Sequence, residues 1–425
     1  MSEQQINQLI DHLFRHQSGK MVSVLTRIFG TENIALAEDV VQDSLIEAIQ
    51  HWSFKGIPAN PTAWLFKVAK NKALTTINRE KYKDQYTTDA ARLLQSQWTV
   101  QPTLDHLFSE KEVLDDQLRM MFTCCHPVLS HDSQIALILK TLCGFSIPEI
   151  AKAFLTSDEN INKRLVRARQ KIRDSKIPFE VPTANALAER LQTVLETIYL
   201  LFNEGYSAHS GQNLIRFEVC EEAIRLTEII IAHKTIDNKS DVYALLALMQ
   251  LNMARFKTRQ DKGNIVTLEH QDRSLWDFSV MEKGFTNLNK SVTGAEISVY
   301  HILASISSYH CSAANYQSTD WESILVLYNK LLAVDNSPVV LLNRAIAVAK
   351  VNGIGPAITE LEKLKYSSTL QSYYLFYSVQ AEFYIELNQY MQAIPLLERA
   401  IELTPNHIEK IFMKRKLAYC NEKIV

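Results

Sequence analysis

Residues Ser133–Lys176 read SQIALILKTLCGFSIPEIAKAFLTSDENINKRLVRARQKIRDSK, and this stretch decides the fold of the first part of the chain. It predicts three helices in a row, with hydrophobicity falling and positive charge rising along them. The first ends at Gly144, since glycine tolerates the left-handed backbone at a helix end. Ser146 and Pro148 begin a short second helix over residues 147–154, because serine caps unpaired amides and proline fits a first turn.

The third helix combines a buried stripe with a basic face. Ser157 or Asp158 caps its start. Its apolar residues recur at helical spacing and are predicted to face the core: Ile161, Leu165, Ala168 and Ile172. Between residues 163 and 176, seven Lys and Arg side chains stand against one acid. Two helices joined by a short turn, the second one basic, indicate a helix-turn-helix that enters a DNA major groove. The alternative is a solvated basic helix on an ordinary bundle.

Composition predicts an all-α chain of two to four domains. The 425 residues are 47% hydrophobic, which supports real cores and excludes a disordered protein. Only 11 Gly and 11 Pro interrupt long runs of helix-forming residues. The net charge of -2 is an average over domains, so the rest of the chain must offset the local basic stretch.

The six cysteines are scattered and indicate neither a disulfide framework nor paired zinc ligands. Cys124 and Cys125 precede His126, but adjacent cysteines are awkward chelators, so we predict a packed turn and no metal. The amino terminus is polar and amphipathic, and no apolar run is long enough to cross a bilayer. We therefore expect a cytoplasmic protein without a membrane partner.

A helix over residues 33–52 carries an acidic face. Asp39, Gln42, Asp43 and Glu47 share one side of it, while the apolar positions, among them Leu36, Val40 and Ile49, are predicted to face inward. An acidic face of this kind is commonly just solvated. It could also bind a basic partner helix.

A second basic face follows a loop that Gly56, Pro58 and Pro61 fix. Its polar members are Lys67, Lys70, Asn71, Lys72, Asn78, Arg79, Lys81 and Lys83. Aromatic side chains lie near it in the sequence: Phe54, Trp64, Phe66 and Tyr82. This combination suits single-stranded nucleic acid, whose unstacked bases need aromatic platforms, although Trp64 itself fits a plain core residue. Periodicity is lost over residues 85–114, which we interpret as a linker.

Three motifs in order resemble regions two and four of bacterial extracytoplasmic-function (ECF) sigma factors. They are AEDVVQDSLIEAIQHW (37–52), NPTAWLFKVAKNKALTTINRE (60–80) and FSIPEIAKAFLTSDENINKRLVRARQKIR (145–173). The resemblance covers about the first 175 residues. The run DDQLRMMFTCCHPVLS (115–130) and the long carboxyl-terminal extension resemble a subgroup that carries a tetratricopeptide-like helical domain. The resemblance implies a promoter-specific sigma subunit that binds core RNA polymerase and promoter DNA, with no catalytic residue and no cofactor.

The resemblance also implies roles for individual residues. Contacts with the clamp coiled coil of the β′ subunit fall on Asp39, Gln42 and Asp43, and region four meets the β flap. The loop from Lys55 to Asn60 would hold a flipped base of the minus-ten element. The residues near the melted strand would be Lys67, Lys70, Asn71 and Arg79. At the minus-thirty-five element, base or backbone contacts fall on Asn160, Asn162, Lys163 and Arg164, with Arg167 and Arg169 beside phosphates.

Some residues depart from the family pattern. Leu155 and Glu159 stand where the family often has glycine, and Thr75 and Asn78 replace a frequent aspartate and arginine. These changes leave the predicted fold standing, and they lie where the family recognises its promoter sequence.

The sequence predicts four segments: region two (1–84), the linker (85–114), region four (115–178) and a helical extension (183–425). Near residues 320–420 a displacement of 36 residues relates Ala345 and Ala357 to Ala381 and Ala393, which is close to the period of tetratricopeptide repeats. Such repeats form a concave surface that binds a peptide or protein partner or a neighbouring segment. A weaker copy includes Trp321.

Four further interpretations, of the extension or of the whole chain, stay open. Glu204 and His209 fit buried hydrogen bonding better than a metal or catalytic site. The segment 270–277 resembles a lock between helices, with docking by Trp276 as the alternative. The chain as a whole could instead be a helix-turn-helix regulator whose repeat domain senses a ligand or a protein. An enzyme in the carboxyl-terminal half is a further possibility, but the sequence there contains no convergent nucleophile, base or phosphate loop.

Overall fold

The computed structural model describes residues 3–81, 107–154, 156–183, 185–206, 215–234, 236–261, 263–293, 296–404 and 406–424. Within these ranges the chain is helical apart from one short hairpin, which confirms the predicted all-α class. The chain divides into two compact units, Met1–Leu200 and Leu201–Val425. In the described part, no helix is long and apolar enough to cross a bilayer.

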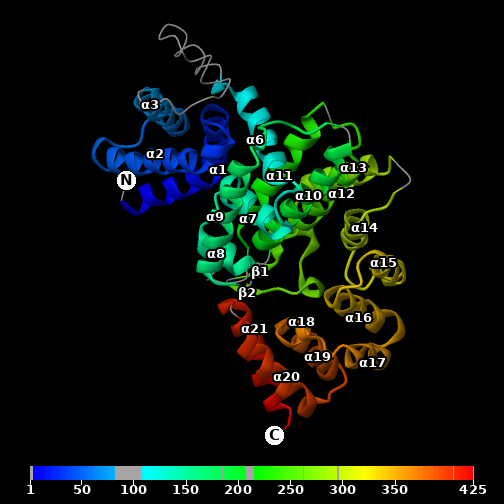
Figure 1. The fold of residues 1–425 in the computed structure, drawn as a ribbon. Helices are drawn as coiled ribbons and strands as arrows, with labels where there is room; N and C mark the ends of the chain where they lie inside the picture. Colours follow the sequence, from blue (N-terminus) through cyan, green and yellow to red (C-terminus); the bar gives the residue numbers. More distant parts are fainter. Residues whose placement is uncertain are drawn as a thin grey trace. The chain divides into compact units, whose positions relative to one another are not determined.

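The first unit is a set of packed helices of different lengths (Figure 1), and its buried side chains are mostly apolar. The elements are α1 (Glu3–Phe29), η1 (Thr31–Asn33), α2 (Ile34–Lys55), α3 (Pro61–Lys81), α6 (Glu110–Cys124), α7 (His131–Thr141), α8 (Ile147–Ala153), α9 (Asp158–Asp174) and the first part of α10 (Asn185–Tyr206). The amino-terminal pattern that allowed either one or two helices forms the single helix α1. Gly30, at φ 91°, ends it.

The two predicted promoter-binding modules pack together in this unit. Helix α1 passes so close to α7 that a Cβ on Gly19 would lie 2.1 Å from the carbonyl oxygen of Leu142, so only glycine fits there. The Thr31 hydroxyl donates to the Ile177 carbonyl over 2.5 Å. Arg27 on α1 pairs with carboxylates of α6. That regions two and four are separate modules therefore stays a prediction. In the described structure, these contacts join the two regions.

Helix α6 begins earlier than the sequence suggests. Residues 110–114, predicted as the end of the linker, are helical, because buried Val113 packs into the core. The rest of the predicted linker up to residue 106, and Tyr82 and Lys83 with it, lies outside the described residues.

The helix-turn-helix forms as predicted. Gly144 ends the preceding helix region with φ 65°. Ser146 and Glu149 form reciprocal hydrogen bonds at the start of α8, in which the Ser146 amide donates to Oε2 of Glu149 over 2.9 Å. The hydroxyl of Ser157 accepts from the Asn160 amide over 3.3 Å and caps α9. Local capping chemistry thus fixes the ends of both helices.

The second unit contains the rest of α10 and a long series of helices. The elements are α11 (Phe217–Ala232), α12 (Ser240–Met253), η2 (Phe256–Thr258), β1 (Gln260–Asp261), β2 (Asn264–Ile265), η3 (Leu268–His270), η4 (Arg273–Leu275), α13 (Phe278–Ser291), α14 (Val299–Ser312), α15 (Trp321–Val334), α16 (Pro338–Asn352), α17 (Ile354–Lys363), α18 (Ser368–Gln371), α19 (Tyr374–Glu386), α20 (Tyr390–Leu403) and α21 (His407–Glu422). β1 and β2 pair antiparallel, with Gln260 opposite Ile265.

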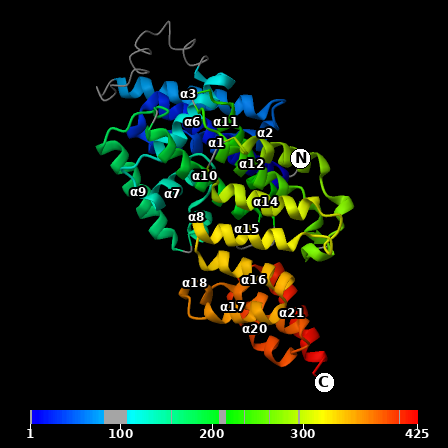
Figure 2. The ribbon, with the colours of Figure 1, turned by 90° about the vertical axis from the view of Figure 1, so that its right-hand side faces the viewer.

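The 36-residue repeat coincides with two helix pairs. Ala345 and Ala357 bring α16 and α17 together, and Ala381 and Ala393 do the same for α19 and α20. All four alanines are fully buried, because small side chains let the helix backbones approach closely. Figures 1 and 2 show α14 to α21 following one another in a curved row. Its last helix, α21, lies beside β2.

The segment around Trp276 is the predicted lock. Arg273 donates to the carbonyls of His310 (2.5 Å) and Ala313 (2.7 Å), and its guanidinium lies 4.7 Å from the centre of the Trp276 ring. Trp276 is buried in a cluster with Leu251 and Cys311. Because it is buried, the alternative that Trp276 docks a partner is wrong.

Candidate nucleic-acid interface

Helix α9 presents a polar, basic face opposite its buried stripe. Ile161, Leu165, Ala168 and Ile172 are all buried, as predicted. On the outside, four of the predicted DNA-contacting residues are exposed: Asn160, Asn162, Lys163 and Arg167. Lys163 pairs with Glu159 over 2.7 Å on the helix surface, and such an exposed pair contributes little to stability. The first half of α9 is therefore accessible to DNA in the way a recognition helix requires.

Two arginines of α9 are only partly exposed and pair with carboxylates of neighbouring helices, contrary to the expectation that they face DNA. Arg164 pairs with Asp132 of α7 over 3.3 Å, and its guanidinium lies 5.1 Å from the centre of the Phe154 ring. Arg169 pairs with Glu38 of α2 over 2.6 Å, and its side chain is 19% exposed. Both positions border the buried stripe of α9, which explains why these side chains turn to neighbouring helices.

The pair between Glu38 and Arg169 joins the two predicted modules. Burial raises the pKa of Glu38, while the neighbouring guanidinium of Arg169 opposes that shift. Within the described ranges, Oε1 of Glu38 and Nε of Arg169 are buried without a hydrogen-bond partner. The pair is thus incompletely satisfied, and a buried ion pair of this kind contributes little net stability.

Helix α2 presents the predicted acidic face. Asp39, Gln42 and Asp43 are exposed, while the positions between them pack into the core. The sequence interpretation of the inner face was wrong for Ile49, which is 40% exposed, as Ile46 is at 45%. Ile46 and Ile49 follow the acidic residues at helical spacing and extend their face. An acidic rim with exposed aliphatic side chains is typical of a surface that binds another protein.

The second basic face is smaller than predicted. Lys55, Asn60, Lys67 and Asn71 are exposed. Lys70 is 8% exposed and has an interaction partner of its own, so the prediction that it faces DNA is wrong. A lysine that is largely buried is stabilised by such a partner, because desolvation of its charge is costly.

The other residues in and around this face have different structural surroundings. The side chain of Arg79 lies outside the described residues. Asn60 caps α3, since its side-chain oxygen accepts from the Ala63 amide over 3.0 Å. Thr75 donates its hydroxyl to the Asn71 carbonyl within the helix. Gly56 (φ 81°) ends α2, and open space surrounds it.

One aromatic side chain at this face is fully available. Phe54, at the end of α2, is 91% exposed and precedes the loop from Lys55 to Asn60. Trp64 is half-buried against Trp52, with ring centres 5.4 Å apart, and Phe66 contacts Phe108 edge to face. Phe54 is therefore the described aromatic residue best placed to stack on a base. The sequence signal for Phe54 was an aromatic residue directly before the Lys55-Gly56 turn.

The other candidate sites have structural roles. Burial raises the pKa of the Cys124 thiol to about 12, and Cys125 is buried beside it. Among the described residues, no group of three or more His, Cys, Asp or Glu side chains could hold a metal ion. Glu204 is buried and pairs with Arg216, while His209 lies outside the described residues.

The exposed basic face of α9, its capped partner helix α8 and the exposed acidic face of α2 define a helix-turn-helix protein with a second, acidic surface. Comparison with protein families agrees: residues 13–82 match sigma-70 region 2, residues 119–172 match sigma-70 region 4, and residues 190–292 match a family of unknown function (DUF6596). An uncharacterized protein of Rhizobium meliloti is 33% identical over 397 residues, which are 93% of this chain and 92% of that protein. No solved structure matches the chain significantly. The chain belongs to the sigma factors of RNA polymerase, as an ECF-like member with a carboxyl-terminal extension.

Proposed function

We propose that the acidic face of α2 is the surface through which this sigma factor binds the clamp coiled coil of the polymerase β′ subunit. The observation that carries the proposal is the exposure of Asp39, Gln42 and Asp43 on one side of the helix. Ile46 and Ile49 continue that side and add apolar area. Carboxylates steer a basic partner toward the surface, and the apolar area strengthens the complex once it forms.

We further propose that two faces of the first unit bind the promoter. Phe54, Lys55, Lys67 and Asn71 would contact the minus-ten element, with Phe54 stacking on an unpaired base. On α9 the contacts would come from Asn160, Asn162, Lys163 and Arg167 at the minus-thirty-five element, and region four would also meet the β flap. Amide side chains read adenine through paired hydrogen bonds, which suits Asn160 and Asn162.

The experiment that tests the polymerase surface is a pull-down of core polymerase with the double variant Asp39→Arg and Asp43→Arg. We expect binding to fall at least tenfold, because two attractive charges become repulsive at the centre of the contact. Helical content measured by circular dichroism should stay unchanged, since both side chains are exposed.

The matched control reverses the charge at two exposed positions of another helix, with Glu221→Arg and Glu228→Arg on α11. It changes the net charge by the same amount and should leave binding intact. Equal binding by both double variants would remove α2 from the interface.

The carboxyl-terminal extension is proposed to regulate or support this activity through a ligand, protein or peptide. We propose that the chain acts in the cytoplasm, by binding and without covalent chemistry of its own. Run-off transcription with purified core polymerase tests this directly. A sigma factor directs a specific start with core enzyme alone, whereas a regulator would need another sigma factor.

A further inference from the structure

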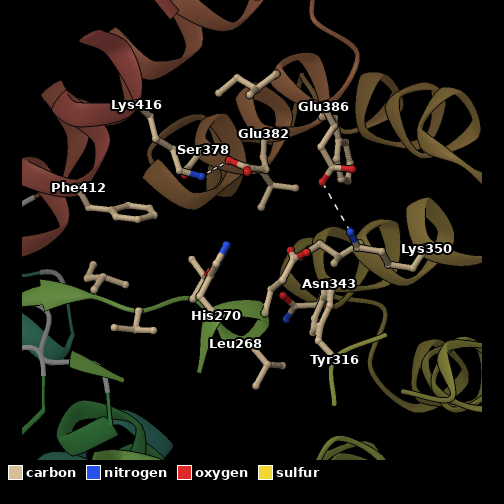
Figure 3. Close-up of a pocket in the computed structure, with 18 of the residues that line it drawn as sticks. Leu268, His270, Tyr316, Asn343, Lys350, Ser378, Glu382, Glu386, Phe412 and Lys416 are labelled. Carbon is tan, nitrogen blue, oxygen red and sulfur yellow. Dashed lines mark hydrogen bonds and ion pairs between the residues drawn. The ribbon is translucent and has the colours of Figure 1, made fainter. Parts of the chain in front are cut away.

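The second unit contains a cavity of about 950 Å³ on the inner side of its helical row. Residues of α16, α19 and α21 form three of its walls, including Asn343, Ser378 and Phe412 (Figure 3). Tyr316 and Trp321 lie at the end formed by α15 and the loop before it. The volume lies at the upper end of the range for small-molecule sites, which is about 300–1,000 Å³.

The fourth wall of the cavity is the segment of residues 265–270 in the same unit, which runs from the end of β2 through η3. This segment is fixed in place: the Val266 amide donates to the Arg259 carbonyl over 2.9 Å, and the Gln271 side chain donates to the Val266 carbonyl over 3.1 Å. It runs beside α21, where an extended partner peptide would otherwise lie along the inner helices. The space that is left suits a compact small molecule better than a peptide.

Three basic and three acidic side chains line the cavity: Lys350, Arg415 and Lys416, and Glu269, Glu382 and Glu386. Lys350 pairs with Glu386 over 3.6 Å, and Lys416 pairs with Glu382. Arg415 and Glu269 also line the cavity, and neither has an ion pair or a hydrogen bond with any residue that the structure describes. Glu269 interacts electrostatically with Lys350, which leaves Arg415 as the lining cation without a carboxylate partner among the described residues. An unpaired guanidinium beside aromatic walls selects an anionic group, because its donors match the planar geometry of a carboxylate.

From these features we propose that the cavity binds a small amphipathic organic anion. Its ring-containing or aliphatic body would pack between Tyr316, Phe412 and the apolar residues of α16 and α19. Its carboxylate or similar acidic group would pair with Arg415. This site belongs to the extension alone, so it stands independently of the polymerase and promoter contacts.

The test uses the full-length protein and two dyes that differ in one group. The anionic dye 8-anilinonaphthalene-1-sulfonate carries a sulfonate on an aromatic body, and N-phenyl-1-naphthylamine is its neutral counterpart. Fluorescence titration should show one saturable site for each dye. Arg415→Glu should weaken binding of the anionic dye at least tenfold and leave the neutral dye unaffected, because only the anion meets the guanidinium.

The matched control is Lys414→Glu, which makes the same change of charge on the neighbouring exposed position of α21 that does not line the cavity. It should leave both dyes bound as in the wild type. Ser378→Trp should displace both dyes, since Ser378 lines the cavity and the indole would fill it. Arg415→Gln provides a milder variant, and circular dichroism verifies folding of each one.

Three results would overturn the proposal. The first is the lack of a saturable site for the anionic dye. The second is an equal loss of its binding in Arg415→Glu and Lys414→Glu, which indicates general surface charge. The third is undisturbed binding of both dyes in a folded Ser378→Trp variant, which places the dye site elsewhere.

Discussion

Two arginines two positions apart on α9 show how position decides what a side chain can do. Arg167 lies on the exposed side of the helix, and within the described ranges it has no ion pair or hydrogen bond. Arg169 follows Leu165 by one helical turn and precedes Ile172 by three residues, so it borders the buried stripe and reaches Glu38. The two residues have the same charge, but only Arg167 is free to meet a phosphate.

We therefore expect Arg167→Ala to weaken duplex binding by a similar factor on every DNA sequence. The slope of log affinity against log salt should become shallower by about 1, because one phosphate contact and its released counterion are lost. Fluorescence anisotropy with a labelled duplex at several salt concentrations measures this. Arg169→Ala is the matched control and should leave the slope unchanged. An unchanged slope for Arg167→Ala would mean that this side chain meets no phosphate.

The exposure of Lys70 and of Ile49 was predicted wrongly for the same physical reason. Lys70 was assigned to a basic face by its type, but Ala73 and Ile77 follow it at helical spacing and are buried, so its position is on the inner side of α3. Ile49 was assigned to the core by its type, but it lies on the exposed side of α2. Helical position thus predicted exposure better than residue type did. The exposure of Asp39, Gln42 and Asp43 was predicted correctly because residue type and helical position agreed.

At the scale of helices, local signals predicted the elements, and long-range contacts escaped prediction. The caps at Ser146 and Ser157 act within one turn, so the sequence could place α8 and α9 closely. The hydrogen bond from Thr31 to Ile177 joins positions 146 residues apart, and no local pattern marks either partner. The same holds for Glu38 and Arg169. The ion pair between α2 and α9 is therefore information that only the three-dimensional structure supplies.

The ion pair between α2 and α9 gives a test of that packing. Glu38→Arg and Arg169→Glu should each lower the free energy of unfolding, since each leaves two like charges together in a partly buried place. Combining them restores the opposite charges, so the double variant should recover about 1–3 kcal/mol relative to the sum of the single changes. Urea unfolding measures all four proteins. The exposed pair of Glu159 and Lys163 is the control, and its exchange should give a coupling of less than about 1 kcal/mol.

Additivity of the two single changes would contradict this contact. It would mean that Glu38 and Arg169 do not interact in solution, and the contacts of η1 with α9 would remain to join these parts of the unit.

For the whole molecule, the compactness of the first unit sets a condition on promoter binding. A folded unit of 200 residues has a radius of gyration of about 16 Å. The minus-ten and minus-thirty-five elements lie about 25 base pairs apart by their names, which is about 85 Å of duplex. Two faces of one compact unit cannot reach both elements of a straight duplex. The contacts that join α1, η1 and α2 to α7, α9 and Ile177 must therefore open before both elements are bound.

A reversible cross-link tests whether this opening is required. All six native cysteines are buried, so a maleimide reagent should react only with cysteines introduced at the surface. Glu32→Cys and Pro178→Cys flank the hydrogen bond between Thr31 and Ile177 and lie within reach of a short linker. Joined by a disulfide-containing bismaleimide, the variant should lose run-off transcription, and dithiothreitol should restore it by cleaving the linker. The single-cysteine variants, treated alike, should remain active throughout. Full transcription by the cross-linked protein would show that region two and region four reach the promoter without separating, and the DNA would then have to bend to meet both faces.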